Sequence, residues 1–245
     1  MSNIWATFGS LPRGTCEDGV QASIPRALTY LTTRDQNRFR KKFSEQAQDE
    51  HQVMHTFREL LVGVFMSRQG YAACYERNID GLTPDWHFQR EADDVFIADV
   101  VNLHVERRIE TQIDRALQEG HTWSGEIPDQ SQRLSSILWI KAGKYNQLAA
   151  RKRIPYVVFI FGWREALVQS HQIEECLLQP EGVFQGYPTL SGVYHVDESG
   201  NYLYNQNAGY GFDYHANPIA AHPAAWPNGT LPYRFPPRSD GRDFQ

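Results

Sequence analysis

The fold is decided by residues 71–103, which have the sequence YAACYERNIDGLTPDWHFQREADDVFIADVVNL. Three segments of this stretch are rich in aromatic and β-branched residues, and two stretches of turn-forming residues, 78–81 and 89–94, separate them. We therefore predict a three-stranded meander. Its strands are residues 71–77, 82–88 and 95–103. The third strand is apolar on both faces, which is typical of a central strand covered on two sides, so its single acid, Asp99, needs a structural or functional reason.

Helical patterns flank the meander. Before it, apolar residues recur three and four positions apart within residues 35–67, and Gly70 follows where such a helix would end. After it, the pattern predicts helices over 105–119, 131–151 and 164–178 and a buried strand over 156–162. The order helix, three-strand meander, helix, helix, strand, helix predicts an α/β fold in which a mixed sheet is flanked by helices.

The two ends of the chain differ from this middle part. Residues 1–34 mix Gly, Pro and Thr without a sustained period, which indicates an irregular N-terminal arm with short helical pieces. The last 41 residues hold six of the thirteen prolines, so we expect an extended wrap or a loose tail there. The expected organisation is one domain, with an arm at 1–34, a core at 35–180 and a Pro- and aromatic-rich C-terminal extension at 181–245 packed on or wrapping the core.

Composition excludes several classes of protein. With 24 Lys and Arg against 29 Asp and Glu, the formal charge of −5 gives no overall field that would attract nucleic acid. The longest strongly apolar stretch, Tyr156 to Phe161, is far shorter than the roughly 20 residues of a membrane helix, and the first residues lack a signal-peptide pattern. Three widely separated cysteines, Cys16, Cys74 and Cys176, argue against a disulfide framework. We therefore expect a cytoplasmic protein that does not contact a membrane.

Four features occur in the order expected of a metal-dependent phosphodiesterase site. They are Glu59 in the first predicted helix, Pro84-Asp85 in the second strand, Asp99 in the third strand, and the helical segment Lys141-Ala142-Gly143-Lys144-Tyr145. Hydrolysis of a phosphodiester needs a hard cation held by carboxylate oxygens, a water that this cation activates, and a positive charge for the phosphorus oxygens. Asp85 and Asp99 are the predicted metal ligands, and Lys141 or Lys144 is the predicted cation.

At these residues the sequence resembles the PD-(D/E)XK nuclease superfamily, which has the restriction-endonuclease-like fold, and in particular a broad group of small bacterial members. The resemblance covers about residues 49–220. Its motifs are Arg58-Glu59-Leu60, Gly81-Leu82-Thr83-Pro84-Asp85-Trp86, Phe96-Ile97-Ala98-Asp99-Val100, Lys141…Lys144-Tyr145 leading to Pro155-Tyr156-Val157-Val158, and Ser191-Gly192-Val193…His215-Ala216-Asn217-Pro218-Ile219-Ala220. The resemblance implies a nuclease dependent on Mg²⁺ or Mn²⁺, with the metal held by Asp85 and Asp99 and supported by Glu59.

The sequence departs from this family pattern at the third strand. The family places an acid, one residue and then a lysine there, whereas this chain has Asp99-Val100-Val101. Some relatives supply the lysine from the following helix. Lys141 occupies the first position of a Gln-xxx-Tyr-like pattern that ends at Tyr145, so we favour Lys141 over Lys144 as the replacement. The same departure motivates the alternative function, a catalytically inactive subunit of the same fold that binds nucleic acid or serves in assembly.

The expected partner is nucleic acid, with DNA favoured over RNA, and the resemblance leaves open a homodimer or a partner protein in a bacterial defence or repair complex. A basic cluster in the first helix and one aromatic residue are the candidate nucleic-acid contacts: Arg38, Arg40, Lys41, Lys42 and Tyr145. A solvated helix face is the default interpretation of that cluster.

Several of these residues also have structural interpretations. Asp99 is alternatively the acid of a buried salt bridge with an arginine such as Arg107 or Arg108, and Glu59 an exposed or paired helix acid. His51 and His55 have the i, i+4 spacing of helical zinc ligands, but Gln52 stands where a His-Glu-x-x-His motif requires Glu, so surface histidines are the better account.

Overall fold

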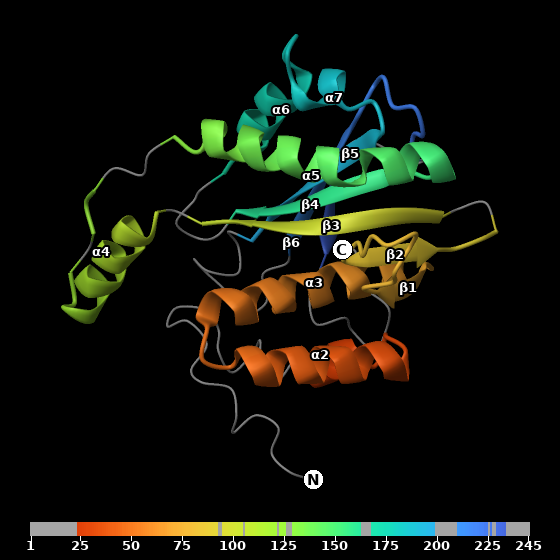
Figure 1. Cartoon of the computed structure of the whole chain (residues 1–245). Helices are drawn as coiled ribbons and strands as arrows, with labels where there is room; N and C mark the ends of the chain where they lie inside the picture. The colour runs from red at the N-terminus through yellow and green to blue at the C-terminus, as the bar shows by residue number, and fades with distance from the viewer. Residues whose placement is uncertain are drawn as a thin grey trace.

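A mixed β-sheet lies between two layers of helices in the computed structural model of the chain (Figure 1). The structure describes residues 24–92, 95–104, 106–121, 123–125, 129–162, 168–198, 210–224, 226 and 229–233. Within these residues no helix is both long enough and apolar enough to cross a membrane. The predicted α/β class, a mixed sheet flanked by helices, is confirmed.

In the described part of the chain the sheet has seven strands, and their order in space follows their order in the chain. They are β1 (Ala72–Tyr75), β2 (Trp86–Gln89), β3 (Val95–Leu103), β4 (Tyr156–Gly162), β5 (Leu190–Asp197), β6 (Tyr210–Ala216) and β7 (Gly229–Tyr233). The pairs β3–β4 and β4–β5 are parallel, and the other four pairs are antiparallel. Parallel pairing requires a crossover connection, which α4 (Arg107–Gln118) and α5 (Ser131–Lys152) supply first, and α6 (Ser170–Leu178) and α7 (Val183–Gly186) supply second.

The meander forms in the predicted order, but β2 begins later than residue 82 because the connection from β1 is a longer turn. Asp80 and Gly81 have positive φ angles of 53° and 87°, and the Gly81 amide donates to Asn78 Oδ1 over 3.2 Å. The Glu76 amide donates to the Asp85 carbonyl over 2.9 Å, which closes the turn. This turn places Asp85 immediately before the first residue of β2.

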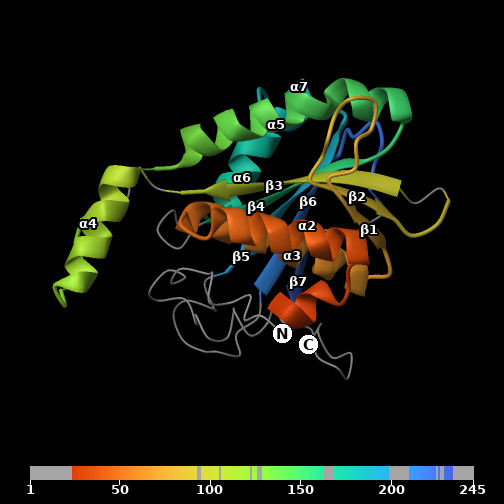
Figure 2. The same cartoon turned by 60° about the horizontal axis from the view of Figure 1, so that its bottom comes forward.

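The predicted helical region at 35–67 is two helices, α2 (Thr33–Gln46) and α3 (Glu50–Arg68). Each has a side-chain cap: Thr32 Oγ1 accepts from the Asp35 amide over 3.2 Å, and Asp49 Oδ1 accepts from the Gln52 amide over 3.1 Å. In Figures 1 and 2, α3 lies against the sheet and α2 lies on the outer side of α3.

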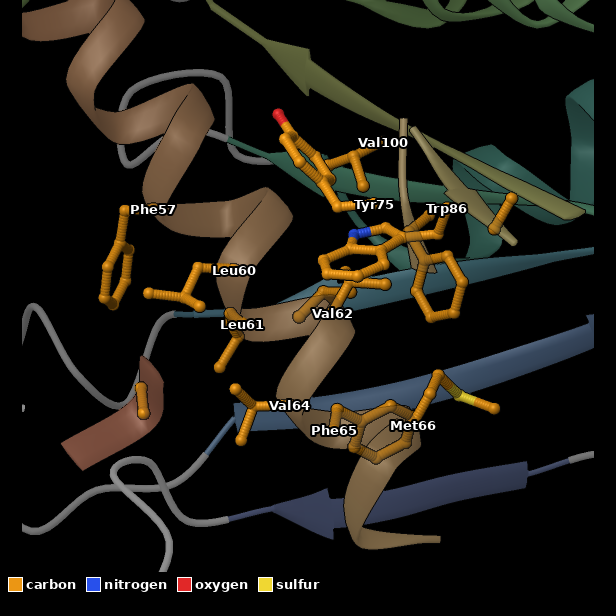
Figure 3. Packing of buried hydrophobic residues seen from close by; sticks show 14 of the residues in the cluster. Phe57, Leu60, Leu61, Val62, Val64, Phe65, Met66, Tyr75, Trp86 and Val100 are labelled. Atoms are coloured by element: carbon orange, nitrogen blue, oxygen red, sulfur yellow. The ribbon is translucent and has the colours of Figure 1, made fainter. Parts of the chain in front are cut away.

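The sheet separates two hydrophobic cores. Alternate residues of β3 point to opposite faces, so Phe96, Ala98 and Val100 pack toward α3, whereas Ile97 and Val101 pack toward α5. Tyr75 and Trp86 lie side by side in the α3 core with their ring centroids 5.0 Å apart (Figure 3). Position 99 follows the same alternation and points to the α5 side, where the lysines of that helix lie.

The C-terminal region contributes to the same sheet. Parallel pairing of β5 with β4 continues the sheet across residue 181, where the sequence places the start of an extension. In β6, Tyr210, Phe212 and Tyr214 are buried in the α3 core, with a polar residue or glycine between them. Most of the predicted arm at 1–34 lies outside the described residues, as do residues 199–209 and 234–245 of the predicted C-terminal extension.

Gly63 of α3 is required by the close approach of Trp86, because a Cβ atom on residue 63 would lie 2.2 Å from Trp86 Cζ2. We expect Gly63→Ala to lower the free energy of unfolding by about 1–3 kcal/mol, although alanine is the better helix former by about 1 kcal/mol. Urea unfolding measures the change. Gly143→Ala in α5 is the matched control, since the three atoms nearest to a Cβ atom there belong to the side chain of Tyr187 and the nearest lies at 3.0 Å. A stabilised Gly63→Ala protein would contradict the packing argument.

Candidate functional site

Asp85 and Asp99 lie next to each other at the junction of β2 and β3. The Asp85 amide donates to Asp99 Oδ1 over 3.2 Å, and the Val100 amide donates to Asp85 Oδ2 over 2.7 Å. Each carboxylate therefore accepts a backbone hydrogen bond from the segment that carries the other. Asp99 is fully buried, whereas Asp85 is half-buried. The antiparallel β2–β3 pairing thus brings together the two acids that the sequence selects as metal ligands.

Lys141 reaches this pair from α5. Its Nζ atom donates to Asp99 Oδ2 over 2.7 Å, and Lys144 Nζ lies 3.7 Å from the same oxygen. Residues three apart share one face of a helix, so both lysines face β3. Burial alone would lower the pKa of Lys141, but the Asp99 and Asp85 carboxylates outweigh burial and raise this pKa. The salt bridge of Asp99 is therefore formed with Lys141, and neither Arg107 nor Arg108 is its hydrogen-bonded partner.

The carboxyl group of Asp85 has an unusual proton affinity. Burial, followed by the negative charges of Asp99 and Glu59, raises its pKa to about 7. The Val100 amide donates to Oδ2 of this carboxyl group. A cation placed at this pair would favour the ionised form of both carboxyl groups.

The donors at this pair are carboxylate oxygens, which are of the kind that magnesium and manganese ions bind. Mg²⁺ commonly binds through one or two carboxylates and completes its shell with water and substrate phosphate, and the Asp85 and Asp99 oxygens are donors of that kind. In the described part of the chain, no group of three or more His, Cys, Asp or Glu side chains is arranged to hold a metal ion. An ion placed at this site would have only Asp85 and Asp99 as carboxylate ligands from these residues.

Glu59 belongs to a neighbouring network on the α3 side. Its Oε2 accepts from Lys42 Nζ over 2.8 Å and from the Tyr75 hydroxyl, and its Oε1 lies 3.1 Å from His55 Nε2. Burial would raise the pKa of Glu59, but the hydrogen bonds and charges of His55 and Lys42 lower it overall. Both oxygens of Glu59 are thus partnered within the protein, and its connection to Asp85 is electrostatic.

The basic side chains of α2 make three different kinds of interaction. Lys42 is part of the Glu59 network and also lies 3.4 Å from Glu76 Oε1. Arg38 Nη1 donates to the carbonyls of Tyr75 and Glu76 over 2.6 and 3.2 Å, so it fixes the end of β1. Arg40 bonds within its own helix, and exposed Lys41 lies 3.7 Å from Glu45.

Tyr145 supports the loop that carries Asp85. Its hydroxyl donates to the Thr83 carbonyl over 2.8 Å, and its ring is buried. Burial and the nearby Asp99 and Asp85 carboxylates raise the pKa of this hydroxyl. The Tyr156 hydroxyl donates to the Lys141 carbonyl over 3.1 Å, so a second tyrosine orients the helix that carries the lysine.

Sequence reasoning missed Tyr75 and the link between Lys42 and Glu59. Tyr75 ends an apolar segment and looks like any core aromatic, and Lys42 is one of several basic residues on its helix. Nothing in the sequence alone separates either residue from its neighbours. Their role depends on how α2 stacks on α3 beside β1. This stacking brings Lys42 into contact with Tyr75, which is 33 positions later in the chain, and with Glu59, which is 17 positions later.

A large cleft opens beside Lys141. Its volume is about 1190 Å³, and its walls come from α3, β3, α4 and α5. His51 and His55 line it on the α3 side, but they have different partners: His51 Nε2 lies 3.1 Å from Glu110 Oε2, whereas His55 binds Glu59. The i, i+4 histidines therefore do not converge on one point.

Fold and site together define a mixed α/β protein with two adjoining carboxylates and a lysine at the junction of β2 and β3. Comparison with family models, curated proteins and solved structures gave no match for the chain.

Proposed function

We propose that this protein is a metal-dependent nuclease of the PD-(D/E)XK superfamily, with the restriction-endonuclease-like fold, that hydrolyses phosphodiester bonds of nucleic acid. One observation carries the proposal: Asp85, which immediately precedes β2, adjoins Asp99 of β3, and Lys141 binds Asp99 over 2.7 Å. Paired acids and a cation in one place are the chemical requirements of this reaction. DNA is the favoured substrate over RNA, and a cytoplasmic location is part of the proposal.

Each residue of the site has one task in this proposal. Asp85 and Asp99 hold Mg²⁺ or Mn²⁺, which when bound supplies activation of water and neutralisation of phosphate charge. Lys141 donates hydrogen bonds to a phosphate oxygen as negative charge develops on it. Tyr145 keeps Asp85 in position through the Thr83 carbonyl. Glu59 adds negative charge beside Asp85.

The location of Lys141 supports the idea that the motif lysine comes from the helix. Val101, at the family's lysine position, is 4% exposed and packs in the apolar core next to α5. Lys141 instead approaches Asp99 from above the strand, with 25% of its side chain exposed.

Metal-dependent stabilisation and cleavage, measured on the same preparations, test the proposal. A ligand that binds only the folded state raises the melting temperature, so Mn²⁺ should raise it for the wild type and for Asp80→Asn, a control at an exposed acid. Asp99→Asn should abolish the rise. Labelled single- and double-stranded DNA and RNA should be cut only when Mg²⁺ or Mn²⁺ is present. If the wild type shows no rise in melting temperature with Mn²⁺ and no cleavage of any substrate, the nuclease proposal is refuted.

An inactive subunit that binds nucleic acid or serves in assembly is the second candidate. The observation in its favour is that both oxygens of Asp99 already have partners, Oδ1 the Asp85 amide and Oδ2 Lys141. A lysine that only neutralises a buried acid would give this arrangement without any metal. The melting experiment separates the two candidates, because the inactive subunit should not respond to Mn²⁺.

Lys141→Met should separate catalysis from metal binding. Loss of one preorganised donor to a developing negative charge typically costs about 10²–10³ in kcat, so we expect a loss of that size. The Mn²⁺-induced rise in melting temperature should remain, because Asp85 and Asp99 are unchanged. Lys144→Met is the matched control with a smaller expected loss, since Lys144 lies 3.7 Å from Asp99 instead of 2.7 Å. Equal losses in the two variants would contradict the assignment of Lys141.

A further inference from the structure

The cleft beside Lys141 adjoins the carboxylate pair through this lysine, while Asp85 and Asp99 are not part of its lining. At one end it is lined by Lys141 and His55, and it continues along β3 to His104 and the first turn of α4. Drug-sized ligands occupy pockets of about 300–1,000 Å³, so a cleft of about 1190 Å³ has room for a short run of nucleotides. A strand whose scissile phosphate lies at Lys141 would therefore place its neighbouring nucleotides in this cleft.

The charges of the lining are balanced. Among the lining residues that the structure describes, three are cationic and three are acidic: Arg107, Arg133 and Lys141 against Asp49, Glu106 and Glu110. In a duplex the bases pair with one another, so a protein surface meets mainly phosphates, and affinity comes from neutralising them with a surplus of Lys and Arg. The cleft has no such surplus, and its lining is suited to contacts with bases.

Two imidazole rings in the lining, those of His51 and His104, are candidates for such contacts. The rings of His51 and His104 meet edge to face with centroids 4.5 Å apart, and 41% of the His51 side chain is exposed. Burial, together with the neighbouring His51 and arginine charges, lowers the pKa of His104 to about 3, so this ring is neutral. Unpaired bases stack on rings of this kind, whereas bases inside a duplex are not accessible to them.

Asn102, which lines the cleft, has an unused hydrogen-bonding group. Its Nδ2 atom lies 2.9 Å from His55 Nδ1, but Oδ1 is buried and has no hydrogen-bond partner among the residues that the structure describes. A buried acceptor without a donor costs free energy. The amino groups on the edges of cytosine, adenine and guanine are donors that would satisfy it.

We propose that the cleft binds single-stranded nucleic acid, with bases entering it against His51 and Asn102 while the strand's phosphate lies at Lys141. This inference rests on the proposed function for the position of the phosphate, and it goes further by naming single strands as the substrate class. DNA and RNA strands share the chemistry that the cleft recognises, so both belong in the test.

Binding without cleavage tests the inference directly. In EDTA, the fluorescence anisotropy of labelled 12-nucleotide DNA and RNA strands and of a blunt DNA hairpin duplex would be measured with the full chain. We expect at least one of the two strands to bind at least ten-fold more tightly than the duplex. The slope of log K against log salt should be about −2 or shallower, because three cations at about 0.7 each set the limit for a single strand. Equal affinity for the duplex, or a much steeper slope, would overturn the inference.

His51→Ala is the variant that locates the bound strand. Loss of a stacking ring should weaken binding of the preferred strand about five-fold or more. His121→Ala, at an exposed histidine after α4, is the matched control and should bind as the wild type does. Identical affinities of the two variants would place the strand elsewhere. The nuclease proposal is judged separately, by metal-dependent cleavage, so a protein that cuts duplex DNA and does not prefer single strands refutes only the inference.

Discussion

Asp85→Asn is expected to abolish metal-dependent cleavage, with a loss of at least about 10³-fold. The bound metal accounts for several kcal/mol of transition-state stabilisation, and each 1.36 kcal/mol is a factor of ten in rate. Asparagine keeps an oxygen that can accept from the Val100 amide, so the β2–β3 junction should be preserved. Single-turnover cleavage of the best substrate in Mg²⁺ measures the effect.

Stability measurements on the same variant show whether the loss is chemical. The pKa of Asp85 is raised to about 7 in the folded protein, above its ordinary value near 3.8. A raised carboxyl pKa contributes stability that is complete below the ordinary value and is lost as the pH rises through 7. Metal-free Asp85→Asn should therefore melt above the wild type at pH 8 and close to it at pH 4. Full activity in Asp85→Asn, or lost activity together with a lower melting temperature at pH 8, would contradict the assigned role.

A further comparison uses an acid of the same turn. Asp80 is exposed and binds Arg151 and Lys152, each over 2.9 Å, so its charge serves a surface salt bridge. We expect Asp80→Asn to cleave as the wild type does, because exposed pairs contribute little. An equal loss in Asp80→Asn and Asp85→Asn would mean that the turn itself, and not the Asp85 carboxylate, determines activity.

The carboxylate pair could be predicted because its signals are local. Asp99 interrupts an otherwise apolar strand, and Asp85 follows a proline in the strand before it. Adjacent strands of a meander usually pair with each other. Two acids that the sequence singles out on adjacent strands therefore come together when the turn between the strands sets the matching register. The helix that carries Lys141 has a clear period, which is enough to place the lysine on the face that covers β3.

The partners of Glu59 could not be predicted, because they depend on packing between elements whose sequences do not specify each other. Lys42 and Tyr75 contact Glu59 only when α2 packs on α3 and β1 lies beside the two helices. The sequence gives one helical period across 35–67 and hides the break at the Asp49 cap. Without the break there is no helix hairpin, and so no contact between positions 42 and 59.

The strands after residue 186 were missed for a different reason. In β6 the residues Tyr210, Phe212 and Tyr214 alternate with Gly211 and Asp213, which is the period of a half-buried strand. Glycine, proline and tyrosine in the surrounding region outweighed this short signal and favoured an irregular extension. Pairing with β5 supplies the hydrogen bonds that a short strand of this kind needs.

Arg58→Met is expected to lower the free energy of unfolding by about 3–5 kcal/mol. Arg58 precedes Glu59 in α3, and its fully buried guanidinium forms a two-bond ion pair with Glu198 at the end of β5. Burial raises the pKa of Glu198, and the Arg58 charge works against that rise. Removing the arginine leaves an unpaired buried carboxylate, which is the costly half of such a pair. Urea unfolding at pH 8 measures the loss.

Two companion variants separate the ion pair from simple loss of packing. The double variant Arg58→Met/Glu198→Met should recover most of the stability, because replacing both members of a buried pair by apolar residues is often neutral or better. Arg115→Met, which breaks only an exposed i, i+4 pair with Glu119, should cost less than about 0.5 kcal/mol. The deficit of Arg58→Met should also shrink toward pH 5, since a carboxyl group with a raised pKa loses its destabilising charge as the pH falls. A deficit that is unchanged by pH and by the second substitution would show that the Arg58 side chain stabilises α3 by packing alone. In the expected case, the ion pair with Glu198 holds the turn of α3 on which Glu59 faces Lys42. A residue 140 positions after Arg58 in the sequence thus fixes one side of the candidate site.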